Sequence, residues 1–460
     1  MNTCKVLVPC GALGTGIMKE AFQYGIDMQP DIIACDAGST DSGPYYLGTG
    51  KGKYARESVK EDMRLMMLGA EKNSIPITVG SCGTCGSDAG VDELAAICHE
   101  ISEEEGISFN IAKIYTQQNP VILKEMYQSG KIHPLEAAPA ITENTFSECT
   151  TIVGLAGADP FIAALKAGAD IILCGRATDT AIIASFPIMK GCSEAAAWHG
   201  AKIAECGGLC TTKPRYGGVL LTFDEEGFTI EALHPDNSCT PYSVSAHMLY
   251  ENANPYRMTE PSGTFDATNS VYTQLPGGKV RVTGTTFEHA PKLTMKLEGA
   301  SVAGYQTISM VGIQDRRIMR NPQEWIQMLC GTAEERLKTL DIPDNYSYAL
   351  KPYGWNAVSG AERVAGSQVP VEIGLMLVVT AISQELATKV AKVFNPLLLH
   401  HPVNQNEQLP SFAFPFSPAE IERGLIYEFR LNHTVELETP LDLVRIVLEF
   451  EKEDVSHDNH

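Results

Sequence analysis

Apolar runs, Gly-rich turns and amphipathic segments alternate along residues 5–190 of the chain. Runs that are apolar throughout are typical of strands buried on both faces, and parallel strands need helical crossovers between them. This pattern predicts a parallel sheet of βα units, in either an open doubly wound or a barrel-like arrangement. The apolar runs are KVLVPC (5–10), DIIAC (31–35), IPITVG (75–80), FNIAKIY (109–115), IVGLAG (152–157) and IILCG (171–175).

A different pattern begins near residue 216, where hydrophobic and polar residues alternate between turn signals, as in antiparallel hairpins. Examples are VLLTF (219–223), GFTIEAL (227–233) and KVRVT (279–283), and helical patterns follow at 322–340 and 382–399. We therefore predict a fold of the α/β class with two domains. Residues 1–215 form the parallel α/β domain that carries the strand-tip loops, and residues 216–460 form an α+β domain that completes a cleft.

The charge balance argues against a nucleic-acid partner. The 460 residues include 35 basic and 56 acidic ones, for a net charge of −21, and nucleic-acid binding needs clustered positive charge. No apolar run is long enough to span a bilayer, and the N-terminus has no signal-peptide pattern. The 13 cysteines have no disulfide-framework spacing. We expect a cytoplasmic protein with reduced thiols and no membrane partner.

The loop DAGSTDSGPYYLGTGKGK (36–53) follows the second predicted strand and concentrates polar groups. Asp36 and Asp41 flank Ser39 and Thr40, and Lys51 lies in the glycine-rich part. The carboxyl ends of parallel strands are where α/β proteins bind ligands, so this loop is a candidate site. Its residues also form turns unaided, which leaves a purely connecting role open.

Two further strand tips carry candidate groups. In GALGTG (11–16), Gly14 and Gly16 would let the backbone contact an anion, although a tight βα turn also accounts for them. In CGRATDTA (174–181), Arg176 suits bidentate capture of a carboxylate or phosphate. Asp179 suits acid/base work or helix capping, and Asp159 occupies a similar position after the preceding strand.

Two other motifs suggest more specific chemistry. Cys82 and Cys85 form a CxxC pair that is suited to redox chemistry or metal binding, although cysteine is also a common small buried residue. His247 and Glu251 stand at i, i+4 spacing, so on a helix the carboxylate could orient the imidazole. A structural role for the histidine is the alternative.

Several segments together resemble the acyclic terpene utilisation (AtuA-type) family. They are CDAGSTDSGPYYLGTGK (35–51), the stretch from GLAGADP to WHGAKIAECGG (154–208), SAHMLYENANPYR (245–257) and KLEGASVAGYQTISMVGI (296–313). The chain is similar to the shorter branch of that family, which has a GSTDSGP loop. The resemblance implies a cytoplasmic bacterial catabolic protein of a pathway with acyl-CoA intermediates, often encoded beside a small companion protein.

We therefore expect a catabolic lyase of the hydratase or dehydratase type, acting on a small carboxylate or acyl-CoA thioester by acid/base chemistry. The candidate catalytic residues are Asp36, Asp41, Arg176, Asp179 and His247. The candidate substrate contacts are Gly14, Gly16, Ser39, Thr40, Lys51 and Asp159. The sequence identifies no cofactor, and we expect a homo-oligomer. The alternatives are an accessory subunit that works with the companion protein, and a metal-dependent enzyme that uses cysteines and aspartates at the strand tips.

Overall fold

The structure is a computed structural model that describes residues 2–361, 368–403 and 412–450. The chain forms two compact units, one of Met1–Ser301 with Phe429–His460 and one of Val302–Glu428. It passes from the first unit to the second within the strand β15 (Leu293–Ile313) and returns within β19 (Glu420–Leu437). Among the described residues, no helix combines the length and the apolar character needed to cross a membrane.

An open ten-stranded sheet forms the centre of the first unit, and five adjacent strands of it are parallel. The sheet has two free ends, so the open alternative predicted from the sequence holds and the barrel-like one does not. The strands are, in spatial order, β12 (Val271–Leu275), β13 (Lys279–Thr283), β9 (Gly227–Ala232), β8 (Val219–Phe223), β1 (Cys4–Val8), β2 (Ile32–Asp36), β3 (Ile77–Gly80), β7 (Ile171–Cys174), β4 (Ile111–Tyr115) and β20 (Arg445–Glu449).

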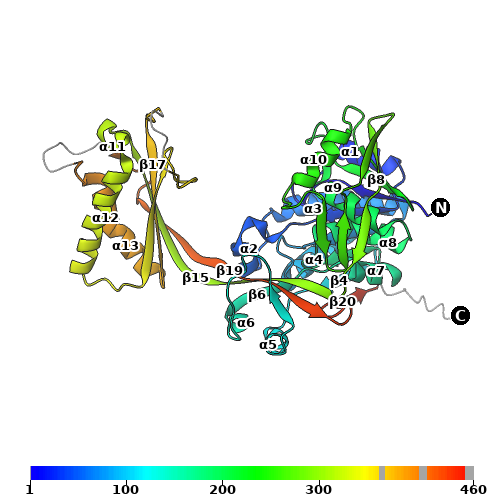
Figure 1. The fold of residues 1–460 in the computed structure, drawn as a ribbon, viewed down its shortest axis with the longest axis horizontal. Helices are drawn as coiled ribbons and strands as arrows, with labels where there is room; N and C mark the ends of the chain where they lie inside the picture. Colours follow the sequence, from blue (N-terminus) through cyan, green and yellow to red (C-terminus); the bar gives the residue numbers. More distant parts are fainter. Residues whose placement is uncertain (1, 362–367, 404–411, 451–460) are drawn as a thin grey trace. The chain divides into compact units, whose positions relative to one another are not determined.

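Helices cover both faces of this sheet, as the apolar strands require (Figure 1). One hydrophobic core joins the sheet to α1 (Lys19–Asp27), α3 (Arg56–Asn73) and α4 (Asp88–Glu105). A second core joins the other face to α7 (Ala158–Lys166), α8 (Asp179–Met189) and α9 (Glu194–Ala204). The strands β1, β2, β3 and β7 are almost entirely buried, which explains their uninterrupted apolar sequence.

The antiparallel hairpins predicted after residue 216 continue the same sheet. The strand β8 pairs with β1, and β9 and β13 extend the sheet beyond it. The boundary predicted at residue 215 therefore differs from the compact units of the structure. The alternating pattern correctly indicates antiparallel strands, but a pattern within a strand does not reveal which strand lies beside it.

One predicted strand joins a different sheet. The run IVGLAG contributes to β6 (Cys149–Gly154), which pairs antiparallel with residues 297–301 of β15 rather than with the parallel strands. Near it, β5 (Ile132–Pro134) pairs with β19.

The remaining elements of the first unit are α2 (Pro44–Thr49), α5 (Pro120–Gln128), α6 (Thr145–Glu148), α10 (Pro241–Ala246), the strands β10 (Arg257–Glu260), β11 (Gly263–Asp266) and β14 (Thr286–His289), and the 3-10 turns η1 (Thr40–Ser42), η2 (Gly207–Cys210) and η3 (His247–Leu249).

The second unit is an antiparallel sheet backed by helices. Its strand β17 pairs with β16 on one side and β15 on the other, and alternate residues of β17 are buried. The two long helices α12 (Pro322–Thr339) and α13 (Gln384–His400) lie along this sheet and share its hydrophobic core (Figure 1). Its elements are β16 (Tyr346–Tyr353), β17 (Ile373–Ala381), α11 (Arg316–Arg320), α12 (Pro322–Thr339), α13 (Gln384–His400) and β18 (Phe412–Ala413).

Candidate functional site

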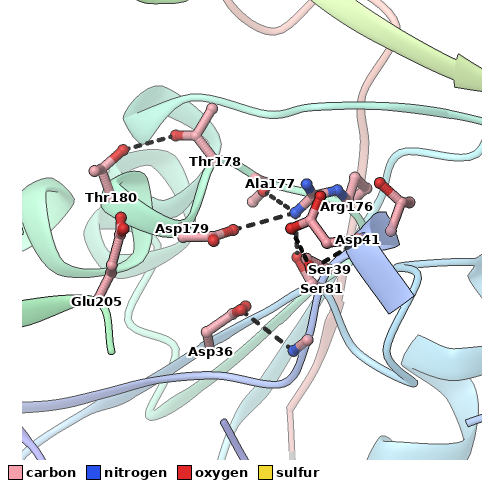
Figure 2. Close-up of polar contacts among 12 residues, drawn as sticks. Asp36, Ser39, Asp41, Ser81, Arg176, Ala177, Thr178, Asp179, Thr180 and Glu205 are labelled. Carbon is pink, nitrogen blue, oxygen red and sulfur yellow. Dashed lines mark hydrogen bonds and ion pairs between the residues drawn. The ribbon is translucent and has the colours of Figure 1, made fainter. Parts of the chain in front are cut away.

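Polar side chains gather at the carboxyl edge of the parallel strands (Figure 2). Asp36 is the last residue of β2, Ser81 follows β3, and Arg176 follows β7. Asp179 begins helix α8, whose N-cap Thr178 accepts a hydrogen bond from the backbone of residue 181. Parallel strands bring their carboxyl ends to one edge, so residues far apart in the chain meet here.

The loops after β3 and β7 are packed tightly against each other. The Arg176 amide donates to the carbonyl of Gly86, and the Ser81 amide donates to the carbonyl of Gly175. Gly86 has a φ of 69°, and a β-carbon there would lie 2.1 Å from the backbone nitrogen of Arg176. Only glycine fits this close approach, which fixes the backbone on which Arg176 is mounted.

A cavity of about 350 Å³ opens beside these loops. Its wall carries five acidic side chains and a single basic one, and the backbone of Gly11, Ala12 and Gly38 contributes to it. The volume lies within the range of small-molecule sites. The charged residues of the wall are Asp36, Asp41, Asp179, Glu205, Glu251 and Lys53.

Arg176 is buried and held by protein acceptors. Its Nε donates to Glu298 at 3.1 Å, and its Nη1 donates to the Ser81 hydroxyl at 3.0 Å, to the Ala177 carbonyl at 2.8 Å and to Asp179 at 3.2 Å. The Arg176 side chain is 7% exposed. Capture of a substrate carboxylate, as expected from the sequence, would have to compete with these bonds. The arginine is placed to position the acidic groups around it.

Glu298 is the principal partner of Arg176, and the sequence patterns did not single it out. It lies on β15, and it also accepts hydrogen bonds from the Thr40 hydroxyl at 2.9 Å and from Lys296 at 2.9 Å. Burial acts to raise the pKa of Glu298, but Arg176 and Lys296 outweigh this effect and lower the pKa to about 2. Thr40, a candidate substrate contact, therefore has an internal partner.

Asp36 has an unusual environment for a carboxyl group. It is 8% exposed, its Oδ2 accepts a bond from the Gly38 amide at 3.3 Å, and its Oδ1 has no hydrogen-bond partner among the described residues. Burial raises the pKa of Asp36 well above its ordinary value, and the nearby charge of Asp179 raises it further, whereas Arg176 opposes both effects. The Asp36 carboxyl at the cavity wall therefore holds its proton more tightly than an ordinary aspartate does.

Two other predicted acids reach the same cavity. Burial raises the pKa of Asp179, and the ion pair with Arg176 opposes that effect. Asp41 lies in the 3-10 turn η1, where its carboxylate accepts a bond of 2.7 Å from the Ser39 hydroxyl. Ser39 also caps the turn by accepting from the Asp41 amide. The structure thus brings Asp36, Asp41, Asp179 and Ser39 together.

The glycine turn GALGTG uses its amides internally. The amides of Gly14, Gly16 and Ile17 donate to the carboxylate of Asp62 at 2.8, 3.0 and 2.7 Å. Asp62 is 2% exposed and lies on α3. The anion that this turn holds is a protein carboxylate. Neither Gly14 nor Gly16 lines the acidic cavity, and the amides predicted to contact a substrate already have an acceptor within the chain.

Lys51 and Asp159 also lie apart from the cavity wall. Both lysines of this loop are exposed, but Lys53 lines the cavity and donates to the Ser42 hydroxyl at 3.0 Å. Asp159 is the second residue of α7 and lines a separate, narrow cavity with Gly157 and Pro261. Lys53 therefore takes the place that the sequence suggested for Lys51.

His247 lies near the cavity but not in the predicted geometry. Helix α10 ends before it, and Glu251 has a φ of 53°, so the two residues do not share a helical face. The ring of His247 instead stacks on Tyr250, with centroids 5.4 Å apart. Burial, with a smaller effect of Lys202, lowers the pKa of His247 to about 4. The imidazole is therefore neutral at physiological pH.

The CxxC cysteines are buried in the protein interior. Cys82 and Cys85 are both free thiols with 0% exposure, and burial raises the pKa of each. Within the described parts of the chain, neither belongs to a cluster of side chains with convergent metal-ligand atoms. The strand-tip thiols of Cys10 and Cys35 lie 3.6 Å apart, on the side of the sheet covered by α1 and α3.

A smaller cavity of about 140 Å³ adjoins the acidic one. Tyr54 and Thr84 line both cavities, and Leu13, Val59 and Leu94 give the smaller one an apolar wall. The wall of the smaller cavity also includes Arg56 and Glu93, so the acidic cavity lies beside one that is apolar in part. Such a pair suits a small molecule with a polar reacting group and a short hydrocarbon chain.

A comparison with protein families identifies the chain. Residues 46–437 match the model of the acyclic terpene utilisation family protein AtuA. The chain belongs to the AtuA family. The match confirms the resemblance seen in the sequence. The matched range includes Arg176, Asp179 and Glu298, but it begins after Asp36 and Asp41. Neither the curated proteins nor the solved structures contain a significant match.

Sequence patterns missed several residues of this AtuA site. Glu298 lies in a strand with no polar cluster, and Asp62 lies within a helix among many charged residues. Glu205 and Cys206 follow helix α9 in a segment that resembles the AtuA family but shows no motif of its own. The only signal for Glu205 is its spacing of three residues from Lys202, with which it forms a buried ion pair.

Proposed function

We propose that this AtuA-family protein is a cytoplasmic lyase of the hydratase or dehydratase type that acts on a small acyl thioester by proton transfer. The observation that supports it most is Asp36, a buried carboxyl group with an unpartnered oxygen and a raised pKa, at the wall of a cavity of suitable size. A carboxyl group that stays protonated at neutral pH is a general acid.

The charge of the cavity favours a thioester over a free carboxylate. A carboxylate placed beside the charged groups Asp41 and Asp179 would be repelled, and Arg176 is already paired. The reacting end of an acyl thioester is uncharged. Its hydrocarbon chain fits the apolar compartment, and the phosphates of a coenzyme A carrier would be attracted by cationic groups of the loop that carries Lys53.

In the proposed reaction two acids divide the proton transfers. A water molecule attacks the β-carbon of an unsaturated thioester while its proton passes to the carboxylate of Asp179. The electron pair of the double bond takes the Asp36 proton at the α-carbon, so one water is added across the double bond. The proton held by Asp179 then passes to Asp36, which restores both groups. Arg176 acts as a positioning residue, because its bond to Asp179 favours the charged form of that base.

The test is turnover of unsaturated and 3-hydroxyacyl coenzyme A thioesters by the full chain. We expect Asp36→Asn to lower kcat by about 100-fold or more with little change in KM, because general acid catalysis contributes that much. Asp170→Asn is the matched control, since Asp170 precedes β7 at the opposite edge of the sheet and bonds the Asn110 amide.

The assay is run with and without the small companion protein, so that dependence on a partner is not mistaken for inactivity. The proposal fails if Asp36→Asn keeps more than about a tenth of wild-type kcat. It also fails for this substrate class if the wild-type chain turns over no thioester, either alone or with the companion protein.

A further inference from the structure

Three side chains with metal-ligand chemistry converge beside the acidic cavity. Glu205 and Cys206 follow helix α9, and His247 begins the 3-10 turn η3. One ligand atom from each lies within 4.8 Å of those of the other two. In the described ranges this is the grouping of histidine, cysteine and acidic residues that converges in this way.

His247 supplies an independent sign of a ligand. His247 is 6% exposed, and its Nε2 is buried with no hydrogen-bond partner among the described residues. Buried polar atoms are nearly always paired, and leaving one unpaired costs about 1–3 kcal/mol. A neutral imidazole with a free nitrogen is also the form in which histidine binds a metal.

Glu205 retains a free oxygen in spite of its ion pair. Lys202 bonds Oε1 of Glu205, and no described residue bonds Oε2. Glu205 and Cys206 both line the cavity, so a cation held by them would face the space that contains Asp36. The ion pair accounts for one oxygen of Glu205, but it accounts neither for the unpaired His247 nitrogen nor for the adjacent thiol.

We propose that Glu205, Cys206 and His247 form a site for a divalent transition metal of the zinc class. A thiolate, an imidazole and a carboxylate suit zinc rather than calcium or magnesium, which prefer oxygen ligands alone. Three protein ligands leave a fourth position open toward the cavity, as in catalytic zinc sites. Binding requires the Cys206 thiol to lose its proton to solvent as the metal–sulfur bond forms.

Metal content tests this site without any assay of turnover, so its outcome is separate from that of the proposed reaction. The untagged full chain is incubated with zinc, desalted and analysed by mass spectrometry for metals. We expect about one zinc per chain. In Cys206→Ser and in His247→Ala the affinity should fall by more than the roughly 10–100-fold typical of losing an outer partner.

Cys330→Ser and His433→Ala are the matched controls. Cys330 is half-buried like Cys206, His433 is buried like His247, and neither lies in the cluster. Both variants should bind zinc as the wild type does. The cobalt form of the wild type should show a thiolate-to-cobalt charge-transfer band that Cys206→Ser lacks.

If the variants do not fold, a measurement on the wild type alone still tests the site. Bound zinc should protect Cys206 from alkylation, as mapped by peptide mass spectrometry. The proposal is overturned if the wild type binds no zinc after loading, or if Cys206 is alkylated equally with and without zinc. Loss of binding in Cys82→Ser with retention in Cys206→Ser would place the metal elsewhere and equally overturn it.

Discussion

The carboxyl group of Asp36 concentrates the properties expected of a catalytic acid. It is buried at the end of a central strand, it has no cation in direct contact, and one of its oxygens faces no donor among the described residues. Such an arrangement is unfavourable for stability, because burial disfavours the charged form and an unpaired oxygen forgoes a hydrogen bond. A residue that lowers stability at a cavity wall is a strong candidate for function.

Asp36→Asn should therefore make the folded chain more stable at neutral pH. Between the unfolded pKa, near the ordinary value of 3.8, and the raised folded pKa, the folded chain keeps a proton that the unfolded chain releases. The contribution of Asp36 to the free energy of unfolding is thus constant below the unfolded pKa and falls as pH rises through this window. The variant lacks that fall and should gain about 1 kcal/mol or more.

Urea unfolding followed by circular dichroism across this pH window measures the difference. Asp170→Asn again serves as the control. A variant that is less stable than the wild type at neutral pH, or one with the same slope against pH, would contradict the assigned protonation of Asp36.

At the scale of elements, the turn after β1 shows how a motif can be misread. The glycines of GALGTG suggested an anion site, and the turn does bind an anion, namely the buried carboxylate of Asp62. Local sequence revealed the capacity of the turn for an anion. It could not reveal that the anion comes from the chain itself, because Asp62 lies 46 residues beyond Gly16.

Asp62→Asn should lower the free energy of unfolding by about 2–4 kcal/mol, since three amides lose a charged acceptor. Chemical denaturation of the two proteins measures the difference. The control is Asp27→Asn, which removes an exposed carboxylate paired with Lys72 and should leave the unfolding midpoint unchanged. Equal midpoints for wild type and Asp62→Asn would show that the turn does not depend on this carboxylate.

The strands of the parallel sheet were predictable because their signal is local. Uninterrupted apolar runs predicted β1, β2, β3, β4 and β7, and the carboxyl-end rule placed Asp36, Asp41 and Asp179 near one another. The helix expected for His247 and Glu251 was wrong because the left-handed conformation of Glu251 breaks the periodicity. A spacing of four residues is meaningful only where the backbone remains helical.

At the scale of the whole molecule, pairing between residues far apart in the chain decides the order of the strands and the partners of the site residues, which local sequence patterns leave open. The strand β20, near the end of the described chain, pairs with β4, and Glu298 meets Arg176 across 122 residues. Each compact unit has hydrophobic cores of its own, and the second unit lies between two segments of the first in sequence. A division read in sequence order therefore could not match the compact units.

Family membership and geometry contribute different parts of the account. The AtuA match covers most of the chain and includes Arg176, Glu298 and the residues of the proposed metal site, Glu205, Cys206 and His247. The proposed chemistry rests on the cavity, where the carboxyl groups of Asp36 and Asp179, whose pKa values are raised, face a compartment beside a partly apolar pocket. The proposed reaction depends on Asp36 holding its proton at a pH at which ordinary aspartates have lost theirs.

The most direct measurement is a carbon-13 NMR titration of chain labelled at the aspartate side-chain carboxyls, with Asp36→Asn used to assign the Asp36 signal. Treatment with a chelator beforehand removes any bound cation from the neighbouring cluster. The account predicts that Asp36 titrates well above the ordinary aspartate value and is still protonated at neutral pH. An Asp36 signal that titrates in the ordinary range would contradict it.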